Sequence, residues 1–208
     1  MFASCSHVAR LDLLSVSRFN LRGVRLRRPR CRVLAGNHDL DFGLEEFREL
    51  MVENNFPWLC SNAWDRNKNE PLGGCKEYFV IDKSNDGGPK ILTVGLVEQG
   101  WLDTLSSIEP EDVIFEAPVD FAKRRVPELV AQLGPFDAVV AVTHMRMPND
   151  RALAAAAREV GIDVILGGHD HNYADEVVDG VRILNSGSDF KMFSVVDVEG
   201  RIDGGGGG

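Results

Sequence analysis

Three short apolar runs in this chain end in the same way, at residues whose side chains can bind a metal ion or carry a proton. The runs are 32–35, 138–143 and 164–166, and they lead into GNHD at 36–39, His144 and GGHDH at 167–171. Apolar runs of this length that stop at glycine or polar residues are typical of buried strands. Sites in open α/β sheets lie at the carboxyl ends of the strands. The sequence therefore predicts one site, built from the loops that follow three strands.

The second and third runs are joined by a helical segment, which predicts a βαβ crossover. The unit consists of strand 137–143, helix 149–160 and strand 163–167, with Asn149 as N-cap and Gly161 after the last turn. Strands joined by such a crossover run parallel. We therefore expect His144 and His169 at the same edge of the sheet.

Elsewhere the sequence predicts hairpins at 77–97 and 177–184 and helices at 44–52 and 118–133, the second kinked or split by Pro127. The run 57–62 predicts another buried strand. It ends at Asn62, which is interpreted as a turn residue, with a place near a substrate as the alternative. Trp101 and Phe115 are expected in an irregular connection. These elements predict an α/β domain, a mixed β-sheet core flanked by helices.

The formal net charge of −9 is unevenly distributed. Residues 1–32 contain eight Arg and one acidic residue, a charge of +7, which leaves −16 on the rest of the chain. An acidic domain disfavours nucleic acid and anionic membranes as partners. No apolar run approaches the length of a membrane span. We therefore expect neither nucleic acid nor a membrane as a partner.

The segment 1–31 is rich in Arg and Ser, a composition typical of an organelle transit peptide. The alternative is a terminus without a targeting role. We expect this segment to be disordered and outside the domain, and 204–208 to form a flexible glycine tail. The predicted location is cytoplasmic, or organellar if 1–31 is a transit peptide. Cysteines without paired spacing are predicted to be reduced and mostly buried, namely Cys5, Cys31, Cys60 and Cys75.

The residues at the strand ends favour metal chemistry. An amide oxygen can bind a metal, an imidazole can transfer a proton near neutral pH, and a carboxylate can fix the imidazole tautomer. A single histidine at a strand end is usually a hydrogen-bonded surface residue. Three of them, His144, His169 and His171, together with Asn37, are better explained by a metal site.

The strings GNHD at 36–39, TH at 143–144 and GGHDH at 167–171, in this order, resemble the calcineurin-like metallophosphoesterases. Within that family, GNHDLDFG followed by NFPWLCSNAWD is similar to the 5′-nucleotidase branch. The resemblance implies a β-sandwich core flanked by helices, with the domain spanning 32–203. It also implies a phosphoester substrate, with a nucleotide as one candidate.

The resemblance further implies a role for each site residue. Asn37, His144 and His169 would hold one divalent ion, and His171 would belong to a second. His38 would act as general acid on the leaving group, with Asp39 orienting its imidazole. Mn, Zn, Fe and Mg are not distinguished. In such a site two ions clamp the phosphoryl oxygens and activate a water.

Two motifs of the family, Asp-x-His and Gly-Asp, are not found before Gly36. In the family they supply the carboxylate that bridges the metals and further ligands of the second ion. We therefore expect the N-terminal strands of the fold to be missing, and the chain as written to hold one metal weakly and hydrolyse phosphoesters poorly. A form extended upstream would be active.

Two further hypotheses stay open at this point. One is a non-catalytic remnant that binds phosphate ligands or partner proteins. The other is a structural single-metal protein, which is disfavoured because structural sites prefer Cys ligands in closed tetrahedral shells. The 5′-nucleotidase branch also carries a C-terminal domain that grips the nucleoside, and the chain stops before one, so nucleotide specificity is a hypothesis.

Overall fold

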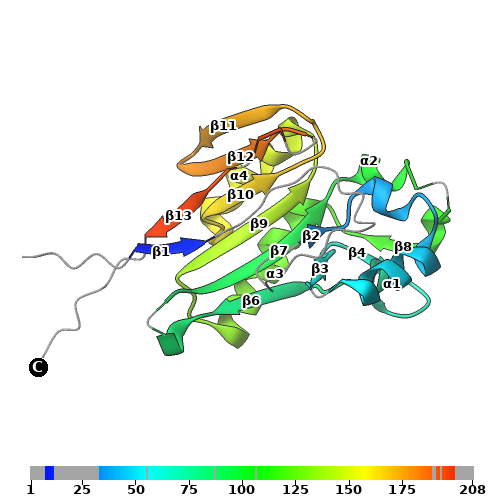
Figure 1. Cartoon of the computed structure of the whole chain (residues 1–208), viewed down its shortest axis with the longest axis horizontal. Helices are drawn as coiled ribbons and strands as arrows, with labels where there is room; N and C mark the ends of the chain where they lie inside the picture. The colour runs from blue at the N-terminus through cyan, green and yellow to red at the C-terminus, as the bar shows by residue number, and fades with distance from the viewer. Residues whose placement is uncertain are drawn as a thin grey trace, which may run out of the picture.

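The largest element of the computed structural model is a six-stranded mixed sheet in the order β11-β12-β10-β9-β7-β6 (Figure 1). Its strands are β6 (Tyr78–Asp82), β7 (Lys90–Val97), β9 (Ala138–His144), β10 (Val164–Gly167), β11 (Tyr173–Val178) and β12 (Val181–Ser186). The structure describes residues 8–11, 33–54, 56–86, 88–105, 107–188, 191–192 and 194–199.

The four central strands of this sheet, β7, β9, β10 and β12, run parallel, and β6 and β11 pair antiparallel at the two edges. Val97 at the end of β7 lies opposite His144 at the end of β9. Met145, the next residue, forms a bridge with His169 after β10. The prediction that His144 and His169 lie at the same edge is therefore confirmed, as are both predicted hairpins.

Two helices, α3 (Pro118–Leu133) and α4 (Met147–Val160), cover one face of the sheet (Figure 1). Their apolar side chains pack with those of β7, β9 and β10 in the largest core cluster. α3 is a single helix that contains Pro127, so of the two predicted effects, a kink or a split, the split is wrong. The prediction of Asn149 as N-cap is also wrong, because α4 begins two residues earlier, with Arg146 as N-cap and a proline in its first turn.

A smaller lobe packs against the C-terminal end of β7, around Gly95 and Val97, and is shown at the right of Figure 1. It holds β2 (Val33–Leu34), β3 (Trp58–Leu59), β4 (Ala63–Asp65), β5 (Glu70–Pro71), β8 (Val113–Phe115), α1 (Leu44–Glu53) and α2 (Gln99–Leu102). Short 3-10 turns cover Asn37–Leu40, Leu72–Gly74, Ser84–Asp86 and Pro110–Asp112. Trp101 is buried in α2 and Phe115 ends β8, so neither lies in an irregular connection. Local patterns missed both because these elements have only three or four residues.

The junction between the lobe and the sheet requires a glycine at position 95. A Cβ atom there would lie 2.6 Å from Leu59 Cβ and 2.9 Å from Leu34 Cδ1. Asn62 ties the same junction together, because its amide donates to the carbonyls of Val97 and Glu116 and its oxygen accepts the amide of Val97. Asn62 is buried, so the interpretation as a simple turn residue is wrong.

The remaining strands, β1 (Val8–Leu11) and β13 (Val196–Glu199), pair antiparallel. A strand at 8–11 was not expected, because the segment 1–31 was predicted to be disordered. The other residues of that segment, and the glycine tail 204–208, lie outside the described residues, so the domain boundaries stay predictions. Cys60 and Cys75 are free and buried as predicted, whereas Cys5 and Cys31 are not described. In the described part of the chain, no helix is long and apolar enough to cross a membrane.

Candidate active site

Asn37, His38 and Asp39 lie on the 3-10 turn that follows β2. Gly36 brings this turn close to β9, since a Cβ atom at position 36 would lie 3.1 Å from Cε1 of His144. The amide of Gly36 donates to Asp39 Oδ2 at 2.8 Å, which closes the turn. The predicted residues of the first motif therefore come directly against the end of the main sheet.

Three candidate ligand atoms converge between this turn and the main sheet. Asn37 Oδ1 lies 2.9 Å from His144 Nε2, and His169 Nδ1 lies 3.0 Å from the same nitrogen. Neighbouring ligands that are about 2.1 Å from an ion and at right angles to each other lie about 3.0 Å apart. The three atoms therefore have the spacing and the chemistry to bind one divalent ion. Among the described residues, no group of three His, Cys, Asp or Glu side chains could hold a metal ion without another kind of ligand. In this cluster the third ligand is the amide oxygen of Asn37.

Burial keeps both histidines of this cluster neutral. The pKa of His144 is lowered to about 3, mainly by burial and to a smaller extent by the charges of His169, His38 and His171. Burial also lowers the pKa of His169, against the opposing effect of Glu98. Neutral imidazole is the form that binds metals. Near pH 7 both rings can therefore offer a lone pair.

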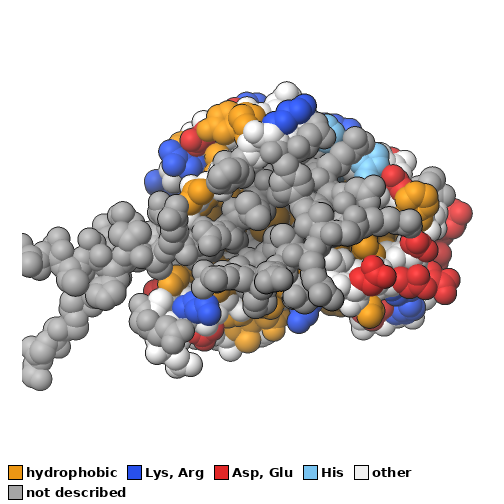
Figure 2. Space-filling view, viewed as in Figure 1, with side chains coloured by type: hydrophobic (Ala, Val, Ile, Leu, Met, Phe, Trp, Pro, Cys, Tyr) orange, Lys and Arg blue, Asp and Glu red, His pale blue; other side chains and the backbone are white. Residues whose placement is uncertain are grey.

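The GGHDH loop presents its two histidines from unusual backbone conformations. His169 has φ of 88° and His171 has φ of 54°, both in the region that non-glycine residues rarely adopt. Such strain persists where the surrounding structure holds it, and it concentrates at functional sites. His171 is exposed and influences His144 and His169 through its charge. Histidine side chains reach the surface on the face shown in Figure 2.

The orientation of His38 differs from the expected one. Its Nδ1 lies 3.0 Å from Asp41 Oδ2, so Asp41 supplies the carboxylate that was expected from Asp39. Burial raises the pKa of Asp39 to about 6, and the Gly36 amide and the charge of His38 partly offset this rise. Asp39 thus braces the turn and lies near His38. A spacing of three residues within a turn would have identified Asp41 from the sequence.

Glu98 is a site residue that the sequence reasoning missed. It follows β7 directly and is only 2% exposed. Its Oε2 accepts the Arg146 amide at 2.8 Å and Asn149 Nδ2 at 2.6 Å, and Oε1 lies 2.5 Å from Arg146 Nη1. Oε1 also lies 3.8 Å from His169 Nε2. The rule that identified the histidines, a polar residue at the end of an apolar run, also identifies Glu98.

Two aspartates hold the loops around the histidines in place. Asp170 Oδ2 accepts the amide of Met147 at 2.7 Å and so ties the GGHDH loop to the start of α4. Thr143 donates its hydroxyl to Asp150 Oδ1 at 2.6 Å. Burial raises the pKa of Asp150 to about 7, against the opposing hydrogen bond from Thr143. Asp150 therefore supports the strand that ends at His144.

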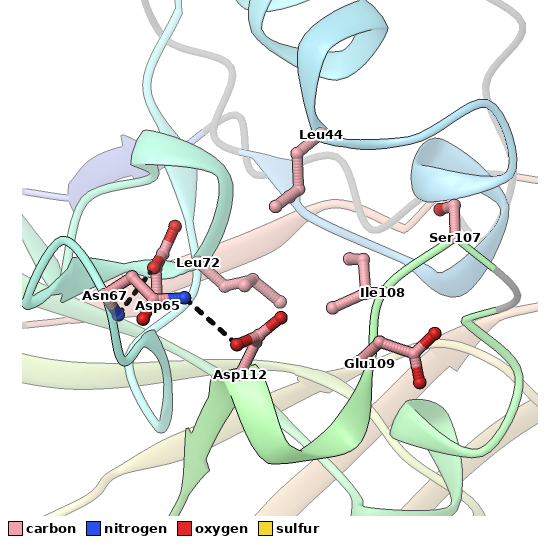
Figure 3. A pocket seen from close by; sticks show the side chains of 8 residues that line it. All are labelled: Leu44, Asp65, Asn67, Leu72, Ser107, Ile108, Glu109 and Asp112. Atoms are coloured by element: carbon pink, nitrogen blue, oxygen red, sulfur yellow. Dashed lines mark hydrogen bonds between the residues drawn. The ribbon is translucent and has the colours of Figure 1, made fainter.

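A separate hollow lies between α1 and the loop before β8 (Figure 3). It is lined by Leu44, Asp65, Asn67, Leu72, Ser107, Ile108, Glu109 and Asp112. Asp65 Oδ1 accepts two backbone amides of the 65–70 turn, and Asp112 Oδ1 accepts the side-chain amide of Asn67. These contacts hold the turn closed, and the hollow shares no residue with the histidine cluster.

Curated relatives of this chain include nucleotidases. A 5′-nucleotidase of Vibrio vulnificus is 33% identical over 147 residues, which cover 64% of this chain and 25% of the relative. A 2′,3′-cyclic-nucleotide 2′-phosphodiesterase/3′-nucleotidase of Yersinia enterocolitica is 27% identical over 154 residues, 65% of this chain and 22% of the relative. The chain thus spans about a quarter of the length of these relatives.

Solved structures share the fold. The calcineurin-like phosphoesterase YfkN of Bacillus subtilis matches with a TM-score of 0.64 at 17% identity, over 82% of this chain and 62% of that one. A 5′-nucleotidase precursor of Thermus thermophilus matches with a TM-score of 0.60 at 19% identity, over 81% of this chain and 38% of that one. The sequence model of the calcineurin-like phosphoesterases matches residues 11–173, which is most of the chain. The chain belongs to the calcineurin-like phosphoesterase family, with 5′-nucleotidases among its relatives.

Proposed function

We propose that this chain is a phosphoester hydrolase that depends on a divalent metal ion and acts on nucleotides or similar phosphomonoesters. The observation that carries the proposal is the convergence of Asn37 Oδ1, His144 Nε2 and His169 Nδ1 at parallel strand ends. The family membership supports phosphoester hydrolysis, and the names of the relatives support a nucleotide substrate.

The residues of the chain divide the work as follows. Asn37, His144 and His169 would hold one ion, and His171 would contribute to a second. Bound divalent ions neutralise phosphoryl charge and lower the pKa of a water. His38 donates a proton to the leaving oxygen, and Asp41, at 3.0 Å from Nδ1, keeps Nε2 as the nitrogen that gives the proton. Asp39 holds the turn that carries His38.

We further propose that the 208 residues as they stand turn over slowly. A two-metal site of this kind needs a carboxylate that bridges both ions. Of the carboxylates described beside the histidines, Glu98 is engaged by Arg146 and Asn149, and Asp170 by the amide of Met147. Both oxygens of Glu98 are thus occupied, and Asp170 is tied to the start of α4. Asp39 closes its own turn, and Asp41 pairs with His38. The affinity for the second ion and the charge balance at phosphorus are therefore expected to be low.

The test measures hydrolysis of an aryl phosphate and of AMP by the purified chain, with Mn²⁺ or Zn²⁺ and with a chelator. We expect weak turnover that the chelator abolishes and that His144→Ala also abolishes. Turnover that survives both changes would contradict the proposal. Fast turnover that the chelator abolishes would support the metal site and contradict the slow rate.

A second function is favoured by the same engagement of Glu98 and Asp170, namely a module that binds phosphate ligands without hydrolysing them. In that case AMP would bind in the presence of Zn²⁺, as measured by calorimetry, and remain intact. Binding with turnover would exclude this alternative.

A further inference from the structure

Glu98 faces the ring edge of His169 that points away from the candidate metal site. The imidazole of His169 has Nδ1 at 3.0 Å from His144 Nε2 and Nε2 at 3.8 Å from Glu98 Oε1. The two nitrogens of one ring therefore face two different partners. One side meets the donor cluster, and the other side meets a buried carboxylate.

A carboxylate in this position selects one tautomer of a neutral imidazole. At 3.8 Å it acts mainly through its charge, which favours a proton on the facing nitrogen, and the Arg146 guanidinium bound to the same oxygen offsets this effect only in part. With the proton on Nε2, Nδ1 of His169 carries the lone pair and points at the donor cluster. Histidines that bind metals commonly have their other nitrogen next to such a carboxylate.

Arg146 and Asn149 hold the carboxylate of Glu98 in place and occupy both of its oxygens, so Glu98 is not available as a metal ligand. Both carboxylate oxygens have donors from Arg146, and Asn149 adds a second donor to Oε2. Gly100 leaves room for this arrangement, because a Cβ atom there would lie 3.1 Å from Arg146 Nη1 and 3.4 Å from Glu98 Oε1. Glu98 is thus held at the end of β7 by the start of α4.

We propose that Glu98 is a positioning residue that fixes the orientation and the Nε2–H tautomer of His169, so that His169 Nδ1 is available to a divalent ion. The inference rests on the proposed function in one respect, the assignment of His169 as a ligand. Removal of a supporting partner of this kind lowers metal affinity by about 10–100-fold.

The experiment uses the 208-residue chain with Glu98→Gln, which removes the charge and keeps the size of the side chain. Zn²⁺ affinity is measured by calorimetry. Long-range ¹H–¹⁵N spectra of the metal-free, ¹⁵N-histidine-labelled chain at pH 8 report the tautomer, with His169 assigned through His169→Gln. We expect the wild-type chain to hold His169 as Nε2–H. In Glu98→Gln we expect signals averaged between tautomers and a Zn²⁺ affinity about 10–100-fold lower.

The matched control is Glu77→Gln. Glu77 is a half-buried carboxylate held by two guanidinium nitrogens of Arg125 of α3 at 2.6 and 2.9 Å. Like Glu98 it is bound by an arginine, but it lies away from the histidines. The substitution Glu77→Gln tests whether the loss of any Glu–Arg ion pair alters Zn²⁺ affinity or the tautomer of His169. We expect Zn²⁺ affinity within twofold of the wild type and an unchanged His169 spectrum. If Glu98→Gln does not fold, Glu98→Asp replaces it, because it keeps the charge and withdraws the carboxylate from His169.

The outcomes separate the two proposals. An Nδ1–H form of His169 in the wild type, or a folded Glu98 variant that leaves either readout unchanged, overturns the role of Glu98. Equal losses in Glu77→Gln also overturn it. A wild-type chain that binds no Zn²⁺ contradicts the proposed function instead, and the metal-free spectra still decide whether Glu98 sets the tautomer.

Discussion

The two halves of the candidate site are held by different kinds of structure. His144 ends β9 and His169 follows β10, and both are central strands of a six-stranded sheet with a helix-covered face. Asn37 and His38 follow β2, a strand of two residues, and sit on a 3-10 turn. The first half is placed by the topology of the sheet, whereas the second is placed by single contacts such as the bond from Gly36 to Asp39. The sheet half is therefore robust, and the turn half depends on individual residues.

The largest effect is expected from the sheet half. His144→Ala removes the nitrogen that both other donors approach, so metal affinity should fall by more than the roughly 100-fold that the loss of a mere supporting residue can cost. Calorimetry with Zn²⁺ measures this. Circular dichroism is expected to show an intact fold, because the strand pairs through its backbone. An affinity within tenfold of the wild type would show that His144 is not a ligand.

The turn half is tested by His38→Asn. In any form of the domain with measurable turnover, kcat should fall by roughly 10²–10⁴, the usual contribution of a positioned general acid. Zn²⁺ affinity should stay the same, since His38 is assigned to the leaving group. A joint loss of metal binding and activity would make His38 a ligand and reverse the assignment.

Asp150, the buried carboxyl group that supports the strand ending at His144, predicts a pH dependence of stability. The folded state holds the Asp150 proton up to a pKa of about 7, above the ordinary 3.8, because of burial. The unfolded state therefore releases this proton first. The contribution of Asp150 is intact below about pH 4 and is lost as the pH rises to about 7, by on the order of 2–4 kcal/mol.

Urea unfolding at pH 4.5 and pH 7.5 measures this contribution when Asp150→Asn is compared with the wild type. The variant keeps a group that can accept the Thr143 hydroxyl but cannot ionise. Its free energy of unfolding should therefore decrease less between the two pH values. The same decrease in both proteins would mean that Asp150 ionises normally in the folded state.

The smallest of these effects is expected at the junction between the lobe and the sheet, where a substitution should lower only the stability of the fold. Gly95→Ala places a methyl group against Leu59 and Leu34, and overpacking of this kind costs about 1–3 kcal/mol. Thermal unfolding measures the loss. Gly161→Asn serves as control, because nothing lies within 4 Å of a Cβ atom there and Asn tolerates its positive φ of 81°. Equal destabilisation by both substitutions would mean that the loss does not come from close packing at the junction between the lobe and the sheet.

The same contrast explains what the sequence could predict. The crossover, the hairpins and the edge shared by His144 and His169 follow from periodicity and from the parallel rule, and all three are confirmed. The spacing of three residues makes Asp41 a candidate partner of His38, but whether Asp39 or Asp41 meets the imidazole depends on how a single turn closes. The position of Glu98 at the end of an apolar run could be read from the sequence, but its role could not, because its partners Arg146 and Asn149 are about 50 residues away in the chain. Hydrogen bonds between distant side chains leave no periodic pattern in the sequence.

The start of α4 has one further consequence. A helix N-terminus normally offers free N–H groups and a partial positive charge, and phosphates often bind there. Here the Arg146 and Met147 amides are already bound by the carboxylates of Glu98 and Asp170. These two amides beside the histidines are therefore not available to bind an external anion. Under the proposed function, a phosphate group finds neither of these two amides free, so we expect its affinity to depend on bound metal ions.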